Sequence, residues 1–164
     1  MVRHGIVIGV VSLVLAGCTP SGPPAPPGPV PPPVPPGDVA RLLLDACNEY
    51  RASRGLPSLV LDPRLQASAG GHSQRMASVG KMAHVGIGDG DPFGRIQSAG
   101  YAYRAAGECV AWGQLDAGSV LRSWESDPPH RAILEGPYVD CGGAGVRGRD
   151  GGIYWCMDFG APAR

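Results

Sequence analysis

The chain has 164 residues, with 14 basic and 14 acidic side chains and no formal net charge at neutral pH. This balance, together with the absence of any basic run, argues against a nucleic-acid partner and against electrostatic attraction to an acidic surface. The 18 prolines are unevenly placed, and they separate an N-terminal leader from a single domain of ordinary size.

The N-terminal residues resemble a bacterial lipoprotein signal peptide. After the basic pair Arg3 and His4, residues 5–15 are uncharged and apolar. A transmembrane helix needs about 20 apolar residues, so this run fits a signal peptide better. Residues 15–18, Leu-Ala-Gly-Cys, resemble a lipobox, in which the cysteine is lipidated and becomes the first mature residue; the alternative is an ordinary secretory signal with a chance cysteine. We expect residues 1–17 to be removed, and lipid on Cys18 to anchor the exported chain in the cell membrane.

A proline-rich stalk follows the lipidation site, over residues 18–37. Eleven of the 18 prolines lie between Thr19 and Gly37. Such a segment cannot bury a core and favours the polyproline II conformation. At about 3.1 Å per residue it spans roughly 50–60 Å when fully extended. We therefore expect a spacer that carries no chemistry.

The domain, residues 38–164, opens with two predicted helices. Asp38 is placed to cap a helix whose apolar stripe runs from Val39 to Tyr50, and Gly55 with Pro57 ends it. Asp62 and Pro63 open a second helix, with proline at the first helical position, and Gly80 ends that one.

The second half of the domain contains the predicted strands. A short helix is expected near 93–99, a strand at 108–112, and a helix at 117–126 that Pro128 and Pro129 break. Residues 139–146 and 153–159 have the pattern of a hairpin. Since the helices come first and the strand pair last, the fold class is α+β or a three-layer sandwich.

Four cysteines remain in the domain once Cys18 is set aside. An even number in an exported chain favours two disulfides, and no close Cys-x-x-Cys pair suggests zinc. Cys141 and Cys156 flank the turn-rich residues between the hairpin strands, so we pair them, and Cys47 with Cys109 follows by elimination.

Histidines and acids provide the candidate chemistry. His84 and His130 lie near Glu108, Glu125 and Asp127 in the sequence. Imidazole and carboxylate together suit zinc or general acid–base catalysis, but no spacing among them is diagnostic. His72 lies on an apolar helical stripe and is expected to be a hydrogen-bonded core residue. The glycine-rich residues 86–91 lack the strand and the closing glutamate of a phosphate or calcium loop, so we expect a turn there.

The order of short motifs resembles the CAP superfamily: the cysteine-rich secretory, antigen 5 and pathogenesis-related type 1 proteins. The resemblance runs from about Leu42 to Gly160 and is closest to the compact bacterial branch. Each piece is weak alone, and their order carries the argument. In chain order the pieces are Asn48-Glu49-Tyr50-Arg51, Gly55-Leu56-Pro57, His72-Ser73, Met76-Ala77, His84, Phe93-Gly94-Arg95-Ile96, Ala99-Gly100-Tyr101, Gly107-Glu108, Trp124, Pro129 to Leu134, Tyr154-Trp155 and Asp158-Phe159-Gly160.

The resemblance implies a three-layer α-β-α sandwich with a central cleft. In many members two histidines and two acids line that cleft and hold zinc or another divalent cation. Carried over residue by residue, these are His84, Glu108, Asp127 and His130, with Glu125 as the alternative to Asp127. This sequence departs from the family pattern in placing Cys109 after the glutamate and Pro129 before the second histidine, and in having Cys156-Met157 on the last strand.

Three functions stay open at this point, because a fold does not imply a function. The first is a non-enzymatic envelope module whose cleft binds a metal and a small, lipidic or envelope ligand. The second is a metal-dependent hydrolase, with His84 or His130 as base and Glu108 as acid or metal ligand. The third is an adhesion domain with a vestigial cleft. The membrane, through the lipid, is a partner in each.

Overall fold

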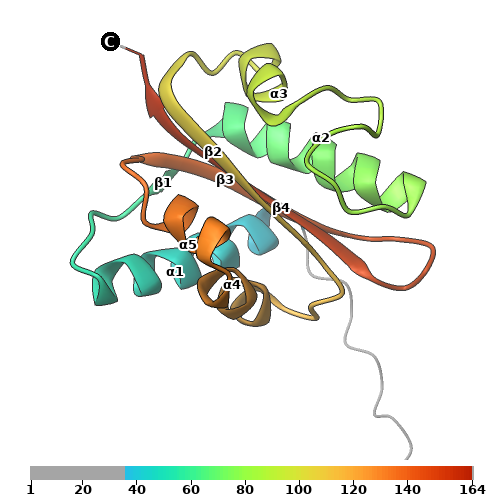
Figure 1. Ribbon diagram of the computed structural model, residues 1–164, viewed down its shortest axis with the longest axis horizontal. Helices are drawn as coiled ribbons and strands as arrows, with labels where there is room; N and C mark the ends of the chain where they lie inside the picture. The colour runs from blue at the N-terminus through green and yellow to red at the C-terminus, as the bar shows by residue number, and fades with distance from the viewer. Residues whose placement is uncertain (1–35, 164) are drawn as a thin grey trace, which may run out of the picture. The chain divides into compact units, whose positions relative to one another are not determined.

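The computed structural model describes residues 36–163 (Figure 1). The predicted signal peptide, Cys18 and nearly all of the predicted stalk lie outside these residues. The elements are α1 (Pro36–Ser53), β1 (Val60–Leu61), α2 (Pro63–Val79), α3 (Pro92–Ser98), β2 (Tyr103–Trp112), α4 (Ala117–Ser126), α5 (Pro128–Leu134), β3 (Asp140–Arg147) and β4 (Ile153–Pro162). None of the helices in the described range has the length and apolar content that crossing a bilayer requires.

The four strands form one mixed sheet in the order β1-β3-β4-β2. β1 runs parallel to β3, whereas the β3–β4 and β4–β2 pairs are antiparallel. The predicted hairpin is therefore confirmed as β3 and β4. β2 lies at one edge of the sheet, so one side of this long strand has no strand partner.

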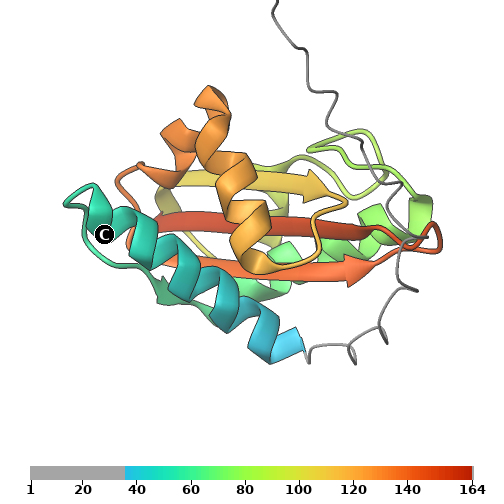
Figure 2. The ribbon, with the colours of Figure 1, turned by 90° about the horizontal axis from the view of Figure 1, so that it is seen from below.

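Helices cover both faces of the sheet, as Figure 2 shows. α1, α4 and α5 lie on one face, and α2 and α3 lie on the other. Alternate strand residues enter two separate cores: Cys109 and Trp155 join the α1 side, while Val110 and Tyr154 join the α2 side. The predicted three-layer α+β sandwich is confirmed.

The helix ends follow the predicted local chemistry. Asp62 caps α2 by accepting from the backbone N–H of Arg64, Pro63 occupies the first turn, and Gly80 ends the helix in the left-handed conformation with φ of 67°. The predicted start of α1 is wrong by three residues, since the helix begins at Pro36 rather than Val39 and Asp38 lies in its first turn instead of capping it.

Two elements were not predicted. Pro128 and Pro129 end α4 as expected, but they also begin a second helix, α5, for which Asp127 is the cap. Proline is tolerated in the first turn of a helix because its missing N–H has no intrahelical partner there. The two-residue strand β1 is too short to give a periodic signal.

Neither predicted disulfide is present among the described residues, where all four cysteines are free thiols. Cys141 and Cys156 cannot pair, since they pack into cores on opposite faces of the sheet. Their register agrees, because Cys156 lies opposite Ala144 rather than Cys141. Cys47 and Cys109 share the α1-side core, and the structure holds both as thiols.

Candidate functional site

The predicted site residues meet at the open edge of the sheet. Glu108 is on β2, His84 lies in the loop between α2 and α3, and His130 is on α5 in the opposite layer. The two imidazole rings stack with their centroids 6.2 Å apart. The site therefore joins both helical layers across the edge strand.

His84 and Glu108 form the first histidine–carboxylate pair. Nδ1 of His84 lies 2.7 Å from Oε1 of Glu108, and the second carboxylate oxygen accepts from the buried guanidinium of Arg95. The Glu108 side chain is only 1% exposed. Burial raises its pKa, but the hydrogen bond from His84 and the charge of Arg95 outweigh burial and hold the pKa below its ordinary value. Glu108 is therefore a buried anion that fixes His84.

His130 and Asp127 form the second pair. Nδ1 of His130 lies 2.6 Å from Oδ2 of Asp127, the residue that also caps α5. The alternative acid, Glu125, makes no side-chain hydrogen bond among the described residues, and its charge acts on Cys47 in the α1-side core. Asp127 is thus the acid that accompanies the second histidine.

His72 lies behind this site and is fully buried. Its Nδ1 bonds Asp89 at 2.6 Å, and its Nε2 bonds the carbonyl of Ala83 at 2.8 Å. The prediction of a hydrogen-bonded core histidine is confirmed. Both bonds hold the loop that carries His84 against α2.

Glu108 also belongs to a buried polar cluster that the sequence did not reveal. Glu108, Cys156 and Asp158 bring three potential ligand atoms within 4.8 Å of one another. Burial, and then the charge of Glu108, raises the pKa of Asp158 to about 8, and burial raises the pKa of the Cys156 thiol well above its ordinary value. Because metal ligands must lose their protons and Arg95 already neutralises Glu108, this cluster does not suit a cation.

The two histidines suit a divalent cation better. Each Nδ1 donates to a carboxylate, which places the lone pair of each ring on Nε2. Within residues 36–163, no hydrogen bond occupies Nε2 of His84 or His130. A carboxylate on the far nitrogen is the usual partner of a metal-binding histidine, because it fixes the ring and makes it more basic. Glu108 and Asp127 thus occupy the positions of the carboxylates that orient metal-binding histidines.

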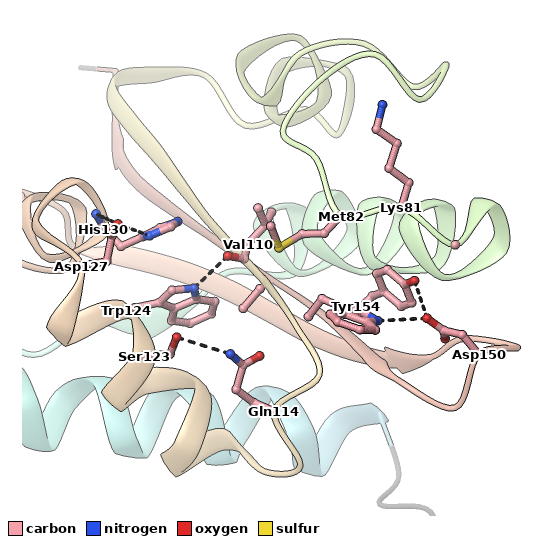
Figure 3. Close-up of a pocket in the computed structure, with 13 residues that line it drawn as sticks. Lys81, Met82, Val110, Gln114, Ser123, Trp124, Asp127, His130, Asp150 and Tyr154 are labelled. Atoms are coloured by element: carbon pink, nitrogen blue, oxygen red, sulfur yellow. Dashed lines mark hydrogen bonds and ion pairs between the residues drawn. The ribbon is translucent and has the colours of Figure 1, made fainter.

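An open groove extends from this site along the edge of β2 (Figure 3). It has a volume of about 670 Å³ and begins at Asp127 and His130. Trp124 forms part of one wall and Met82 part of the other, and Asp150 with Tyr154 closes the far end. The groove provides room for a ligand larger than a metal ion.

Comparison with known proteins decides the family. The model of the cysteine-rich secretory protein family, named CAP, matches residues 44–159. The chain belongs to the CAP family. The match includes His84, Glu108, Asp127 and His130, and so it spans the whole histidine–carboxylate site.

Other CAP relatives agree with this assignment. YkwD of Bacillus subtilis, described as uncharacterized, is 30% identical over 117 residues. The match spans 71% of this chain but only 45% of YkwD, so this chain matches less than half of that relative. What the rest of YkwD contributes is therefore not carried over.

Solved structures share the fold. An outer surface protein from Borrelia burgdorferi superposes with a TM-score of 0.69 at 20% identity, covering 75% of this chain and 92% of that one. An extracellular protein with an SCP domain from Bacillus anthracis gives 0.68 at 23% identity, covering 80% and 45%. At these identities the likeness concerns the CAP fold alone.

Proposed function

We propose that this protein is an exported CAP domain whose cleft binds a divalent cation, zinc in the first instance, through Nε2 of His84 and Nε2 of His130. One observation carries the proposal: both imidazoles are held at Nδ1 by carboxylates, and both keep Nε2 free of hydrogen bonds within the described residues. Imidazole nitrogen is a preferred zinc ligand. Glu108 and Asp127 act as orienting partners rather than as ligands.

The metal would serve as a binding point rather than as a built-in catalyst. Neither cleft histidine forms a hydrogen bond, within the described residues, to a serine hydroxyl or a cysteine thiol that it would activate as a nucleophile. A hydrolase would need a metal-activated water. The simpler function is a module that holds a ligand in the groove beside the histidines.

Calorimetric titration tests the metal. Zinc added to the full chain in detergent should give saturable heats, which His84→Ala and His130→Ala should each abolish. Gln114→Ala, which changes the groove away from the histidines, is the matched control. Equal heats in all four proteins would remove the proposal.

Localisation is the second part of the proposal. We assign Cys18 as the lipidated residue and residues 18–37 as the spacer between membrane and domain, on the lipobox-like sequence before Cys18. Two or more acyl chains make an anchor stable where one is marginal. The wild-type chain should sediment with membranes and the Cys18→Ala chain should not. A Cys18→Ala chain that still sediments would contradict the anchor.

A further inference from the structure

The open edge of β2 provides a ladder of main-chain groups on the floor of the groove. Alternate residues of an edge strand point their N–H and C=O groups toward the partner strand or away from it. In β2 the odd-numbered residues face β4, because the same ladder continues with the N–H of Gly113 donating to the carbonyl of Ile153 at 2.9 Å. The even-numbered residues therefore face outward.

The first part of this outward edge is already covered. The hydroxyl of Tyr138 donates to the carbonyl of Ala106 at 3.4 Å, and α5 packs beside the strand at Cys109, whose thiol contacts the carbonyl of His130. The groove lies along Val110, Ala111 and Trp112, at the end of the strand.

Three main-chain groups of Val110 and Trp112 have no hydrogen-bond partner among the described residues, although Val110 is itself buried and Trp112 is exposed. Indole Nε1 of Trp124 donates to the carbonyl of Val110 at 3.0 Å (Figure 3). Among the described residues no hydrogen bond uses the N–H of Val110 or the N–H and C=O of Trp112. These groups have the spacing of a strand that lacks its neighbour, which is the arrangement that binds an extended peptide by strand addition.

The walls of the groove suit a peptide with alternating side chains. One wall carries Trp124 and Ser123 from α4, and the other carries Met82, so successive side chains of an added strand face different walls. Lys81 stands at the rim and has no ion-pair partner within residues 36–163 (Figure 3). Its free positive charge is complementary to an acidic side chain of the peptide.

We propose that this groove binds an extended peptide segment, which adds to β2 as a fifth strand and carries an acidic side chain toward Lys81. The inference deepens the proposed function, because it names the ligand class of the cleft beside the histidines. It also places one end of the peptide beside His130 and Asp127.

A defined peptide library tests the ligand class. End-capped peptides of about six residues, the usual strand length, are titrated into the full chain in detergent and followed by fluorescence anisotropy. The strongest binder is then remade with one N-methyl group at each position in turn. Of the free groups in the groove only the carbonyl of Trp112 is an acceptor, so strand addition predicts that methylation of one particular peptide N–H should weaken binding about tenfold, and methylation at the other positions should change it little.

Variants of the groove give the matching result from the protein side. Trp112→Pro removes a free N–H at an exposed position and should weaken binding about tenfold relative to Trp112→Ala, while proline is tolerated at an edge strand where the N–H faces outward. Ser123→Phe should block the groove without touching the main chain. The wild-type chain should bind a peptide with glutamate about two- to fivefold more tightly than the same peptide with lysine. Lys81→Glu should reverse this preference by a similar factor. Leu115→Ala, exposed and outside the groove lining, should change nothing.

The outcomes are separable. No peptide binding at about 1 mM, equal effects of N-methylation at all positions, or binding of chito-oligosaccharides or phosphatidylglycerol vesicles in place of peptides would each overturn the inference. The anisotropy assay runs with zinc and with a chelator. If peptides bind but zinc gives no heat, the metal proposal fails and the peptide proposal stands. If zinc gives heat but no peptide binds, the peptide proposal fails and the metal proposal stands.

Discussion

Arg95 and Glu108 form a buried ion pair directly beneath the cleft. The arginine side chain is 7% exposed and the glutamate side chain 1% exposed. Arg95 also donates to the carbonyl of His84 at 3.1 Å, and the same carboxylate accepts from the ring of His84. One arginine therefore fixes both the backbone and the side-chain partner of the first cleft histidine.

Removing this arginine should destabilise the fold. Arg95→Met leaves the Glu108 carboxylate buried without its cation, and we expect the free energy of unfolding to fall by about 3–5 kcal/mol in urea denaturation at pH 7. The matched control is Arg64→Met, which breaks a half-exposed pair with Asp62 and should cost much less stability. Equal losses in the two variants would contradict the role given to Arg95.

The free energy of unfolding at acid pH should also depend on the Arg95–Glu108 pair. Because its folded-state pKa is lowered, Glu108 contributes stability above its ordinary pKa and loses it as pH falls and the carboxylate takes up a proton. The difference in free energy of unfolding between wild type and Arg95→Met should therefore become smaller as the pH falls. A gap that stays constant from pH 7 to about pH 3 would exclude the buried charge as the cause.

Asp158 should have the opposite effect on the pH dependence of stability, because its pKa is raised rather than lowered. Its folded-state pKa is about 8, so between about pH 4 and 8 the native state keeps a proton that the unfolded state has released. The carboxyl thus costs stability as pH rises through this window. Asp158→Asn cannot ionise, so it should be more stable than wild type at pH 8 and should differ little from wild type near pH 4.

Part of the site was accessible from the sequence and part was not. His84, Glu108 and His130 were assigned through the order of short motifs, and the structure brings them together with Asp127. The role of Arg95 could not be predicted, because the sequence of a seven-residue helix does not indicate which strand the helix packs against. Asp158 was quoted only as part of a motif, since its proximity to Glu108 comes from the pairing of β2 with β4.

The cysteines also show that spacing along the chain does not determine which residues meet in the fold. Spacing along the chain placed Cys141 and Cys156 at the two ends of a hairpin, but the face of a strand alternates with each residue. An odd difference in register therefore put the two thiols in different cores. Only the pairing register, which depends on tertiary packing, decides this.

Glycine predictions test how closely α2 packs on the sheet. A Cβ on Gly142 of β3 would lie 2.1 Å from the backbone nitrogen of Gln66, so Gly142→Ala should push α2 from the sheet and cost about 3 kcal/mol or more. Gly71→Ala, on the exposed side of the same helix, meets nothing within 4 Å and should stabilise by about 1 kcal/mol. Thermal unfolding of both variants measures the contrast, and two changes of the same sign would contradict this packing.

Thiol counting tests the absence of disulfides. Cys47, Cys109, Cys141 and Cys156 are all 0% exposed, and burial raises the pKa of each thiol. Because only the exposed thiolate reacts readily, the folded Cys18→Ala chain should show almost no reaction with a thiol reagent. Unfolding in denaturant without reductant should then release four reactive thiols per chain. Two or none would mean that one or two disulfides form in the exported protein, and that the α1-side core rearranges to allow them.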